Sequence, residues 1–152
     1  MSKKYLYPLL SLILIYSFQN EQAIAKKITP INLTGQYSFG DYKTLGGTKS
    51  AGILSVKQIA NNHIKFEIVG YKGPPSYHAG KASGDVFLNN GAGIYHHENP
   101  ELPNCKISFG FFGNKVVVAE TAYGFECGFG NNVSVEGTYT KFSNVFRKIE
   151  YP

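Results

Sequence analysis

The residues of this chain that could do chemistry are four histidines, ten carboxylates and many serines and threonines. Nucleophilic catalysis needs a nucleophile, a base and a group that orients the base. The sequence has no Gly-x-Ser-x-Gly pattern, which presents a nucleophilic serine at a strand-to-helix turn. Glycoside hydrolysis needs two carboxylates that face one bond, whereas Glu98 and Glu101 lie beside Pro100 and Pro103 in a predicted solvated loop. We therefore expect no catalytic residues and a protein that is not an enzyme.

Adjacent histidines raise the question of a metal site. His96, His97 and Glu98 are all good ligand types. Neighbouring residues of a strand point to opposite faces, so His96 and His97 cannot share an ion there without a bulge or a loop. A three-ligand site that adds His78 can be imagined, but two partly exposed histidines at a strand end are the simpler interpretation. We expect no metal and no cofactor.

Residues 127–133, which read CGFGNNV, are the most specific local feature of the sequence. Two glycines surround Phe129, and a disulfide at Cys127 would fix one end of the segment. An ordered loop loses less entropy when it binds a partner, so an exposed Phe129 would suit a contact surface. In the alternative, the glycines serve tight turns and Phe129 caps the core. The candidate partner-binding loop consists of Gly128, Phe129, Gly130 and Asn131.

The start of the chain predicts export. Lys3 and Lys4 precede an uncharged run over residues 5–20, and Ala23 and Ala25 give the small-x-small pattern of a cleavage site. The run is shorter than the roughly 20 apolar residues of a spanning helix. We predict a signal peptide over residues 1–25, a flexible lead-in over 26–32 and a single β domain over 33–152. The expected location is periplasmic or secreted, with no membrane contact after cleavage.

Export places the two cysteines, Cys105 and Cys127, where disulfides persist. A structural zinc site requires four closely spaced ligands. Neither cysteine has another Cys or His within four residues. We predict a disulfide that closes a loop of about 23 residues and stabilises the fold by about 3.4 kcal/mol. The positive net charge is mild and its lysines are scattered, whereas a nucleic-acid binder clusters them on one face. We expect no nucleic-acid partner.

Alternating apolar and polar residues predict an all-β fold of about eight antiparallel strands in a small barrel or sandwich. The expected strands cover residues 33–39, 52–57, 64–68, 77–88, 94–95, 105–111, 115–119 and 133–139. Asn90-Gly91 predicts a type I′ hairpin turn. Two segments share a Gly-x-Tyr pattern, Thr34-Gly35-Gln36-Tyr37 near the start and Glu136-Gly137-Thr138-Tyr139 near the end. Similar first and last strands are consistent with a closed barrel in which these two strands pair. The predicted core contains Tyr37, Leu54, Phe66, Ile68, Ile107, Phe109, Val116, Val118, Val135 and Tyr139.

Residues 127–130 (CGFG) and 137–141 (GTYTK), with the leader, the short strands and one late disulfide, carry a resemblance. Over residues 33–142 the chain resembles small exported β proteins of Gram-negative bacteria, of which the periplasmic lysozyme inhibitors are the best understood. The resemblance implies an eight-stranded antiparallel barrel or sandwich that inserts a loop into an enzyme cleft. The Ser- and Lys-bearing inhibitory loop of those proteins is not found here, so no inhibitory residue is carried over.

The leading hypothesis is an exported, non-enzymatic binding protein, and in its most specific form an inhibitor of a lysozyme-like cell-wall hydrolase. Its expected partner is a secreted or periplasmic protein. The alternative is a β-barrel that holds a small apolar ligand, as eight-stranded barrels can. Whether the barrel interior is filled or hollow separates the two.

Overall fold

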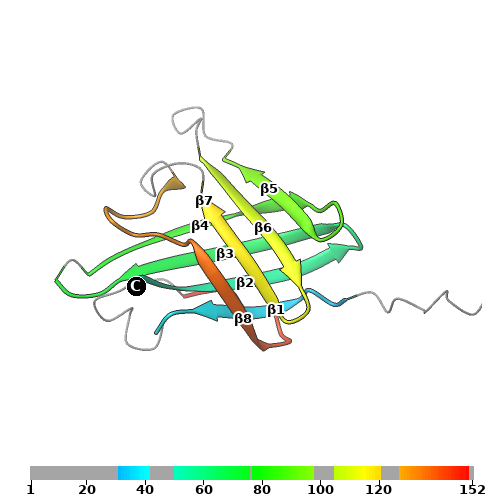
Figure 1. The fold of residues 1–152 in the computed structure, drawn as a ribbon, viewed down its shortest axis with the longest axis horizontal. Helices are drawn as coiled ribbons and strands as arrows, with labels where there is room; N and C mark the ends of the chain where they lie inside the picture. The colour runs from blue at the N-terminus through cyan, green and yellow to red at the C-terminus, as the bar shows by residue number, and fades with distance from the viewer. Residues whose placement is uncertain (1–30, 42–49, 76, 98–104, 121–126, 151–152) are drawn as a thin grey trace, which may run out of the picture. The chain divides into compact units, whose positions relative to one another are not determined.

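Eight antiparallel strands and no regular helix make up the part of the chain that the structure describes (Figure 1). The computed structural model describes residues 31–41, 50–75, 77–97, 105–120 and 127–150. The predicted all-β fold is confirmed, while the predicted signal peptide and most of the lead-in lie outside the described residues. The strands are β1 (Gly35–Phe39), β2 (Ser50–Ala60), β3 (His63–Lys72), β4 (His78–Phe87), β5 (Ala92–His96), β6 (Lys106–Phe112), β7 (Lys115–Glu120) and β8 (Gly137–Ser143).

The strands form one sheet in the order β4-β3-β2-β1-β8-β7-β6-β5, which curls into a nearly closed barrel. The first and last strands pair, with Ser38 opposite Thr140. The two ends of the sheet, β4 and β5, are joined by the bridge between Asn89 and Ala92. Between them, Asn90 and Gly91 have φ of 50° and 80°, as a type I′ turn requires. The strands that carry the similar sequence segments, β1 and β8, therefore pair within the continuous part of the sheet, and the seam of the barrel lies between β4 and β5.

The last strand begins later than predicted. The sequence favours a strand over residues 133–139, whereas β8 begins at Gly137 and runs to Ser143. Val133 and Val135 are buried as an inward strand face would be, but they lie outside the ladder. Their backbone N–H groups have other acceptors, because Val133 bonds to the carbonyl of Gly130 and Val135 to the carboxylate of Glu120. Alternation of burial here arises without strand pairing.

Side chains from all eight strands fill the interior of the barrel. The ten predicted core residues are each at most 2% exposed. Aromatic rings contact one another in this core: the ring centroid of Phe66 lies 5.0 Å from that of Tyr95 and 4.8 Å from that of Phe109. Tyr37 contacts Phe111 edge to face at 6.1 Å. Edge-to-face contacts of this kind add about 0.5–1.5 kcal/mol each to the burial of the rings.

Two buried tyrosines anchor the paired strands β1 and β8. Tyr37 Oη donates to the carbonyl of Leu33 at 2.8 Å, and Tyr139 Oη donates to the carbonyl of Val135 at 2.9 Å. Burial raises the pKa of Tyr37 to about 12 and that of Tyr139 well above its ordinary value. Both phenols therefore stay protonated donors, each bonded four residues back along the chain.

Replacing Tyr139 with Phe is expected to lower the free energy of unfolding by about 1–2 kcal/mol, because the buried carbonyl of Val135 loses its donor. Urea denaturation of the variant measures this. Tyr77→Phe is the control, since Tyr77 is 70% exposed and should shift stability by less than about 0.5 kcal/mol. Equal effects at the two positions would mean that the hydrogen bond of Tyr139 does not stabilise the fold.

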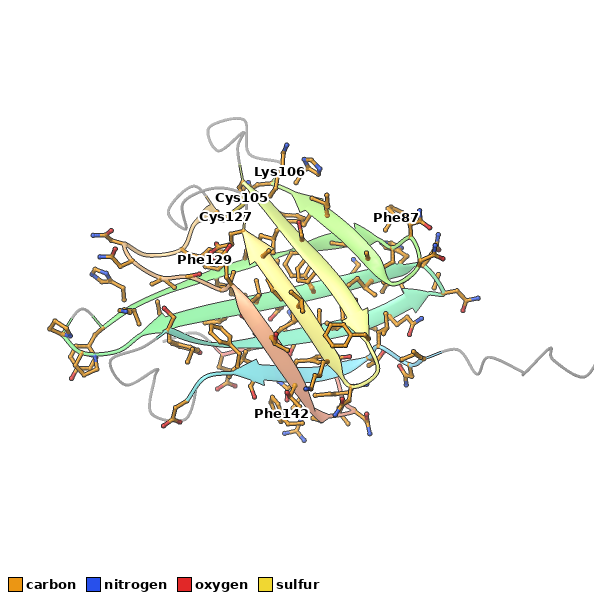
Figure 2. The ribbon with its side chains drawn as sticks, viewed as in Figure 1. Phe87, Cys105, Lys106, Cys127, Phe129 and Phe142 are labelled. Carbon is orange, nitrogen blue, oxygen red and sulfur yellow. A yellow bond between two sulfur atoms is a disulfide. The ribbon has the colours of Figure 1, made fainter. Side chains whose placement is uncertain are left out.

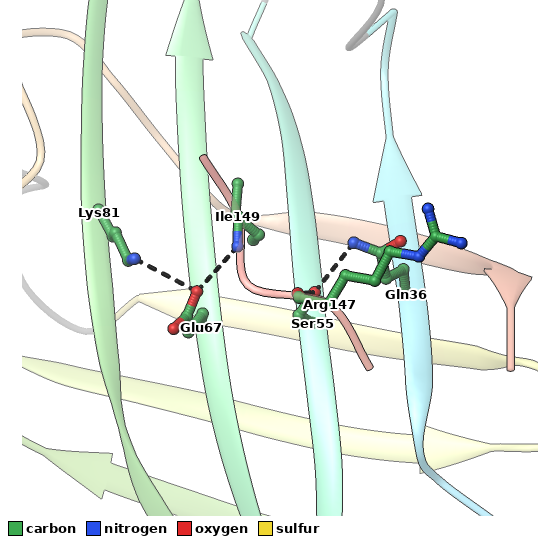
Figure 3. A network of polar contacts seen from close by, with 6 residues as sticks. All are labelled: Gln36, Ser55, Glu67, Lys81, Arg147 and Ile149. Atoms are coloured by element: carbon green, nitrogen blue, oxygen red, sulfur yellow. Dashed lines mark hydrogen bonds and ion pairs between the residues drawn. The ribbon is translucent and has the colours of Figure 1, made fainter. Parts of the chain in front are cut away.

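The C-terminal strap, residues 145–150, crosses the outer face of β2 and β3 (Figure 3). The buried hydroxyl of Ser55 donates to the carbonyl of Arg147 at 2.6 Å, and Glu67 Oε2 accepts from the N–H of Ile149 at 3.0 Å. Lys81 Nζ lies 3.2 Å from the same carboxylate oxygen. Ile149 is buried and forms a second small core with Val69 and Tyr71. The strap thus covers the apolar outward side chains of β3.

Candidate functional site

The predicted disulfide is confirmed and joins Cys105, just before β6, to Cys127 (Figure 2). The two Cα atoms lie 4.9 Å apart, and each cysteine is 1% exposed. The bond holds the start of the segment that leads into β8. We call residues 127–135 the cap segment.

The cap segment packs on a row of glycines inside the barrel. Gly52, Gly70 and Gly80 lie side by side on β2, β3 and β4, each opposite the next. A Cβ atom added at Gly70 would lie 2.8 Å from Cγ1 of both Val133 and Val135. One added at Gly80 would overlap the backbone at Phe129. β3 and β4 therefore leave room for the cap segment because Gly70 and Gly80 have no side chains, whereas a Cβ atom at Gly52 would meet Tyr139 and Phe39.

The expectation of an exposed Phe129 is wrong. Its side chain is 3% exposed and belongs to the main core, so Phe129 caps the barrel, as the alternative interpretation proposed. Gly128 and Asn131 of the candidate loop are exposed. The backbone carbonyl of Asn131 contacts His78 Nδ1 at 2.7 Å, which ties the segment to the start of β4. The loop presents backbone and small polar groups rather than an aromatic side chain.

Of the four histidines, His96 and His97 are neighbours in the chain, whereas His63 and His78 lie at opposite ends of the β3–β4 pair. His96 lies exposed at the end of β5, and the backbone N–H of His97 donates to the carbonyl of Cys105. His78 contacts the cap segment, and His63 Nε2 lies 3.0 Å from Asp85 Oδ1 on the outer surface. Within the described ranges, no three His, Cys, Asp or Glu side chains gather closely enough to hold a metal ion. Glu98 and Glu101 lie outside those ranges.

Glu120 is a half-buried carboxylate that clamps the cap segment to the end of β7. Its Oε2 accepts from the hydroxyl of Ser134 and the N–H of Val135, both at 3.3 Å, and its own N–H donates to Glu136 Oε1. Its Oε1 is buried and has no hydrogen-bond partner among the described residues. Burial raises the pKa of Glu120 above its ordinary value, and the neighbouring charge of Glu136 adds to the rise. An ionised Glu120 is thus disfavoured by the folded state.

Because the folded-state pKa of Glu120 lies above its unfolded value near 4.5, the folded state binds more protons in the interval between them. Stability attributable to this group should therefore rise as the pH falls through the folded pKa towards 4.5. Glu120→Gln keeps an acceptor for Val135 and is expected to flatten this dependence in urea unfolding measured at successive pH values.

Glu136→Gln is the matched control for Glu120→Gln, because it removes a neighbouring charge and leaves the half-buried carboxylate in place. We expect this variant to keep the direction of the pH dependence. An unchanged pH profile in Glu120→Gln would contradict the role assigned to Glu120.

Sequence reasoning missed three parts of this arrangement. The glycine row was visible as Gly52, Gly70 and Gly80 on strands, where glycine marks the close approach of another backbone. The strap could have been inferred from β3. Its outward face carries charged side chains at first and then the apolar side chains of Val69 and Tyr71. Glu120 gave no signal, since a carboxylate at a strand end resembles any surface charge.

No helix within the described ranges is both long and apolar enough to cross a membrane. Comparisons of the chain with protein-family profiles, with curated proteins and with solved structures find no match.

Proposed function

We propose that this chain is an exported, non-enzymatic binding protein that engages its partner through its outer surface. The observation that carries the proposal is the filled interior. The ring of Phe66 contacts those of Tyr95 and Phe109 in the core, and Phe129 belongs to the same core. This packing argues against the alternative of a barrel that holds a small apolar ligand, because ligand sites of that kind need an interior that side chains leave open.

The disulfide supports the exported location. The bond between Cys105 and Cys127 is compatible with an oxidising compartment, where such bonds persist. Together with the predicted leader over residues 1–25, this favours a periplasmic or secreted protein. A disulfide that holds the cap segment also gives the barrel a fixed shape, which lowers the entropy lost when a partner binds.

A cell-wall hydrolase of the lysozyme type is the partner class we propose. It rests on the resemblance of residues 127–130 and 137–141 to the exported inhibitors. In the structure these residues build the barrel: Cys127 forms the disulfide, Tyr139 bonds to Val135, and Lys141 Nζ lies 5.5 Å from the centre of the Tyr37 ring. The resemblance therefore concerns residues that build the fold. The residues that would contact a partner are expected elsewhere, on the surface.

The test is a titration of the purified exported protein against a panel of lysozymes and amidases. We expect calorimetric binding and inhibition of peptidoglycan lysis for at least one enzyme of the panel, and no lysis by the protein alone. An absence of binding across the panel would remove the hydrolase as partner. Release of peptidoglycan fragments by the protein alone would contradict the non-enzymatic proposal, and a small molecule retained in native mass spectra would favour the ligand-binding barrel.

A further inference from the structure

The C-terminal strap lies on the outer face of β2 and β3 as a bound peptide would (Figure 3). Its polar anchors are main-chain groups, because the carbonyl of Arg147 accepts from Ser55 Oγ and the N–H of Ile149 donates to Glu67 Oε2. Ser55 and Glu67 lie opposite each other on neighbouring strands, so the strap meets one anchor on each strand as it crosses them. Main-chain contacts of this kind give affinity for an extended segment whatever its side chains.

One side chain of the strap is buried against the sheet. Ile149 is 7% exposed and packs with Val69 and Tyr71 of β3, whereas the residues on either side of it are exposed. We call the outward side chains of Ser55, Glu67, Val69 and Tyr71 the strap site. The strap site therefore holds the main chain of an extended segment and selects an aliphatic side chain at one position.

The strap is attached to the barrel more weakly than the strands are attached to one another. Its six residues, all of them described, lie outside the eight strands, so the strand pairings do not depend on it. Val145 is 56% exposed, and Ile149 is the one buried side chain among the six. Segments with few buried apolar contacts open locally at low free energy. We therefore expect the strap to leave its site while the barrel stays folded.

The polar anchors of the strap site keep partners of their own when the strap leaves. Gln36 Nε2 donates to Ser55 Oγ at 3.2 Å, and Lys81 Nζ lies 3.2 Å from Glu67 Oε2, and neither contact involves the strap. Contacts that hold the anchors in place before binding lower the entropy lost on binding. A buried polar group costs free energy unless it is hydrogen-bonded, so these anchors suit a surface that a peptide main chain and water cover in turn.

We propose that the strap site binds an extended peptide segment of a partner protein and that the C-terminal strap is its internal competitor. The partner segment carries an aliphatic residue at the position that Ile149 fills and a main-chain carbonyl two residues before it. The proposal rests on the proposed binding function, of which it names the surface and the ligand class. Because only chains with an open strap bind the partner, the apparent affinity falls in proportion to the open fraction.

The first test uses the purified exported protein, isotope-labelled for NMR, and an unlabelled synthetic peptide with the sequence of residues 143–150. We expect the amide of Ile149 to exchange its hydrogen at least about tenfold faster than the paired amides of β3, because the strap opens locally. Saturating peptide should accelerate this exchange further, because it occupies the site and keeps the tethered strap open. Exchange at the rate of the β3 amides, or a rate that the peptide leaves unchanged, would contradict the proposal.

The second test measures the Kd of the labelled peptide by fluorescence anisotropy with full-chain variants. Ile149→Asp places a charge against apolar side chains and releases the strap, so the peptide Kd should be at least about tenfold lower than with the native chain. Val145→Asp is the matched control, because Val145 is an exposed aliphatic residue of the same strap. It should leave Kd within about twofold of the native value.

A further pair of variants locates the bound peptide. Ser55→Ala, introduced into the Ile149→Asp chain, removes the donor to the main-chain carbonyl and should raise the peptide Kd at least about threefold. Ser83→Ala in the same chain is the control, since Ser83 is exposed on β4 opposite Glu67, and Kd should stay within about twofold. Circular dichroism melting of each variant checks the fold. If Ile149→Asp does not fold, the exchange measurement on the native chain decides.

Changes in the peptide test the ligand class. A peptide that keeps the isoleucine and has alanine at its other positions should bind the Ile149→Asp chain within about fivefold of the original, because one anchor side chain carries most of the side-chain energy. A peptide with aspartate in place of the isoleucine should not bind. Loss of binding by the first peptide, or retention by the second, would overturn the assigned ligand class.

The outcomes separate the strap site from the binding function. Equal Kd values for the native and Ile149→Asp chains, or a Kd that Ser55→Ala leaves unchanged, would place the peptide elsewhere and overturn the strap site. These measurements use no hydrolase, so their failure leaves the binding function to its own titration. Peptide binding at the strap site with a negative hydrolase panel would support the site and count against the hydrolase alone.

Sedimentation tests a second copy of the chain as the occupant. We expect the native and Ile149→Asp chains to be monomeric alike. A native chain that dimerises while Ile149→Asp stays monomeric would show that two copies exchange their straps, and this result would overturn the assignment to a partner protein.

Discussion

Replacing Phe129 with Ala is expected to lower the free energy of unfolding by about 3–5 kcal/mol, the usual cost of truncating a buried aromatic ring. Phe129 is 3% exposed and shares a core cluster with Tyr139 and Val133. Its backbone lies so close to Gly80 that the cap segment has little freedom to collapse into the vacated space. The cost should therefore fall towards the upper part of the range. Urea denaturation with the disulfide intact measures it.

Asn131→Ala is the control for Phe129→Ala, because Asn131 is exposed and its backbone carbonyl contacts His78 whatever its side chain. Its expected change is within about 0.5 kcal/mol. If Phe129→Ala proved as mild as Asn131→Ala, the residue would not be part of the core. A loss of partner binding without a loss of stability would restore the interpretation of Phe129 as a contact residue.

Removing the disulfide by replacing Cys105 and Cys127 with Ser should cost about 2–5 kcal/mol, the range for small secreted domains. The bond closes a loop with a sequence separation of 22 residues, so much of the cost comes from the greater freedom of the unfolded chain. Thermal and urea unfolding of the double variant measure it. Hydrogen exchange should show faster opening at Val133 and Val135 than in β2 or β3, because the cap segment loses its anchor.

Two outcomes would contradict the assignment of the disulfide. Mass mapping of the exported protein that finds two free thiols would remove the bond itself. Uniform acceleration of hydrogen exchange over all strands, with no excess in the cap segment, would show that the bond stabilises the barrel without holding the cap. Phe129→Ala in the double variant should cost less than in the native chain, since the two changes act on the same segment.

Much of the fold could be predicted from alternation alone. In β3, Ile64, Phe66 and Ile68 alternate with exposed or half-buried charged residues, and all three are at most 2% exposed. A strand with one face in the core and one in water leaves this pattern in any sequence that adopts it. The turn at Asn90 and Gly91 was equally readable, because few residues accept positive φ at two successive positions.

The cap segment could not be placed by the same reasoning. Val133 and Val135 alternate as a strand does, yet their backbone groups bond to Gly130 and Glu120. Burial requires an apolar side chain at every second residue, but it does not require a neighbouring strand. The contact with Gly80 joins segments far apart in the chain, and such contacts leave no local pattern. This is why the sequence left both a surface and a core position open for Phe129, and the structure places it in the core.

The coverage of the outer faces is harder to predict from sequence for a different reason. Alternation assigns Ile94 and Val117 to an outward face, but a sequence does not state which outward residues another segment covers. Val69 and Tyr71 also point outward, and the C-terminal strap buries them. Only the arrangement in space shows which outward side chains the chain covers itself.

The order in which the barrel closes has a consequence for synthesis. β1 pairs with β8, the cap segment follows the second cysteine, and the strap comes last, so every closing element lies near the C-terminus. Pairings between distant parts of a chain form slowly, because the intervening loop has to be closed first. A polypeptide leaving the ribosome from its N-terminus cannot complete this barrel until almost all of it has emerged. Under the export proposed above, the same delay would leave the polypeptide unfolded for longer before it reaches the membrane.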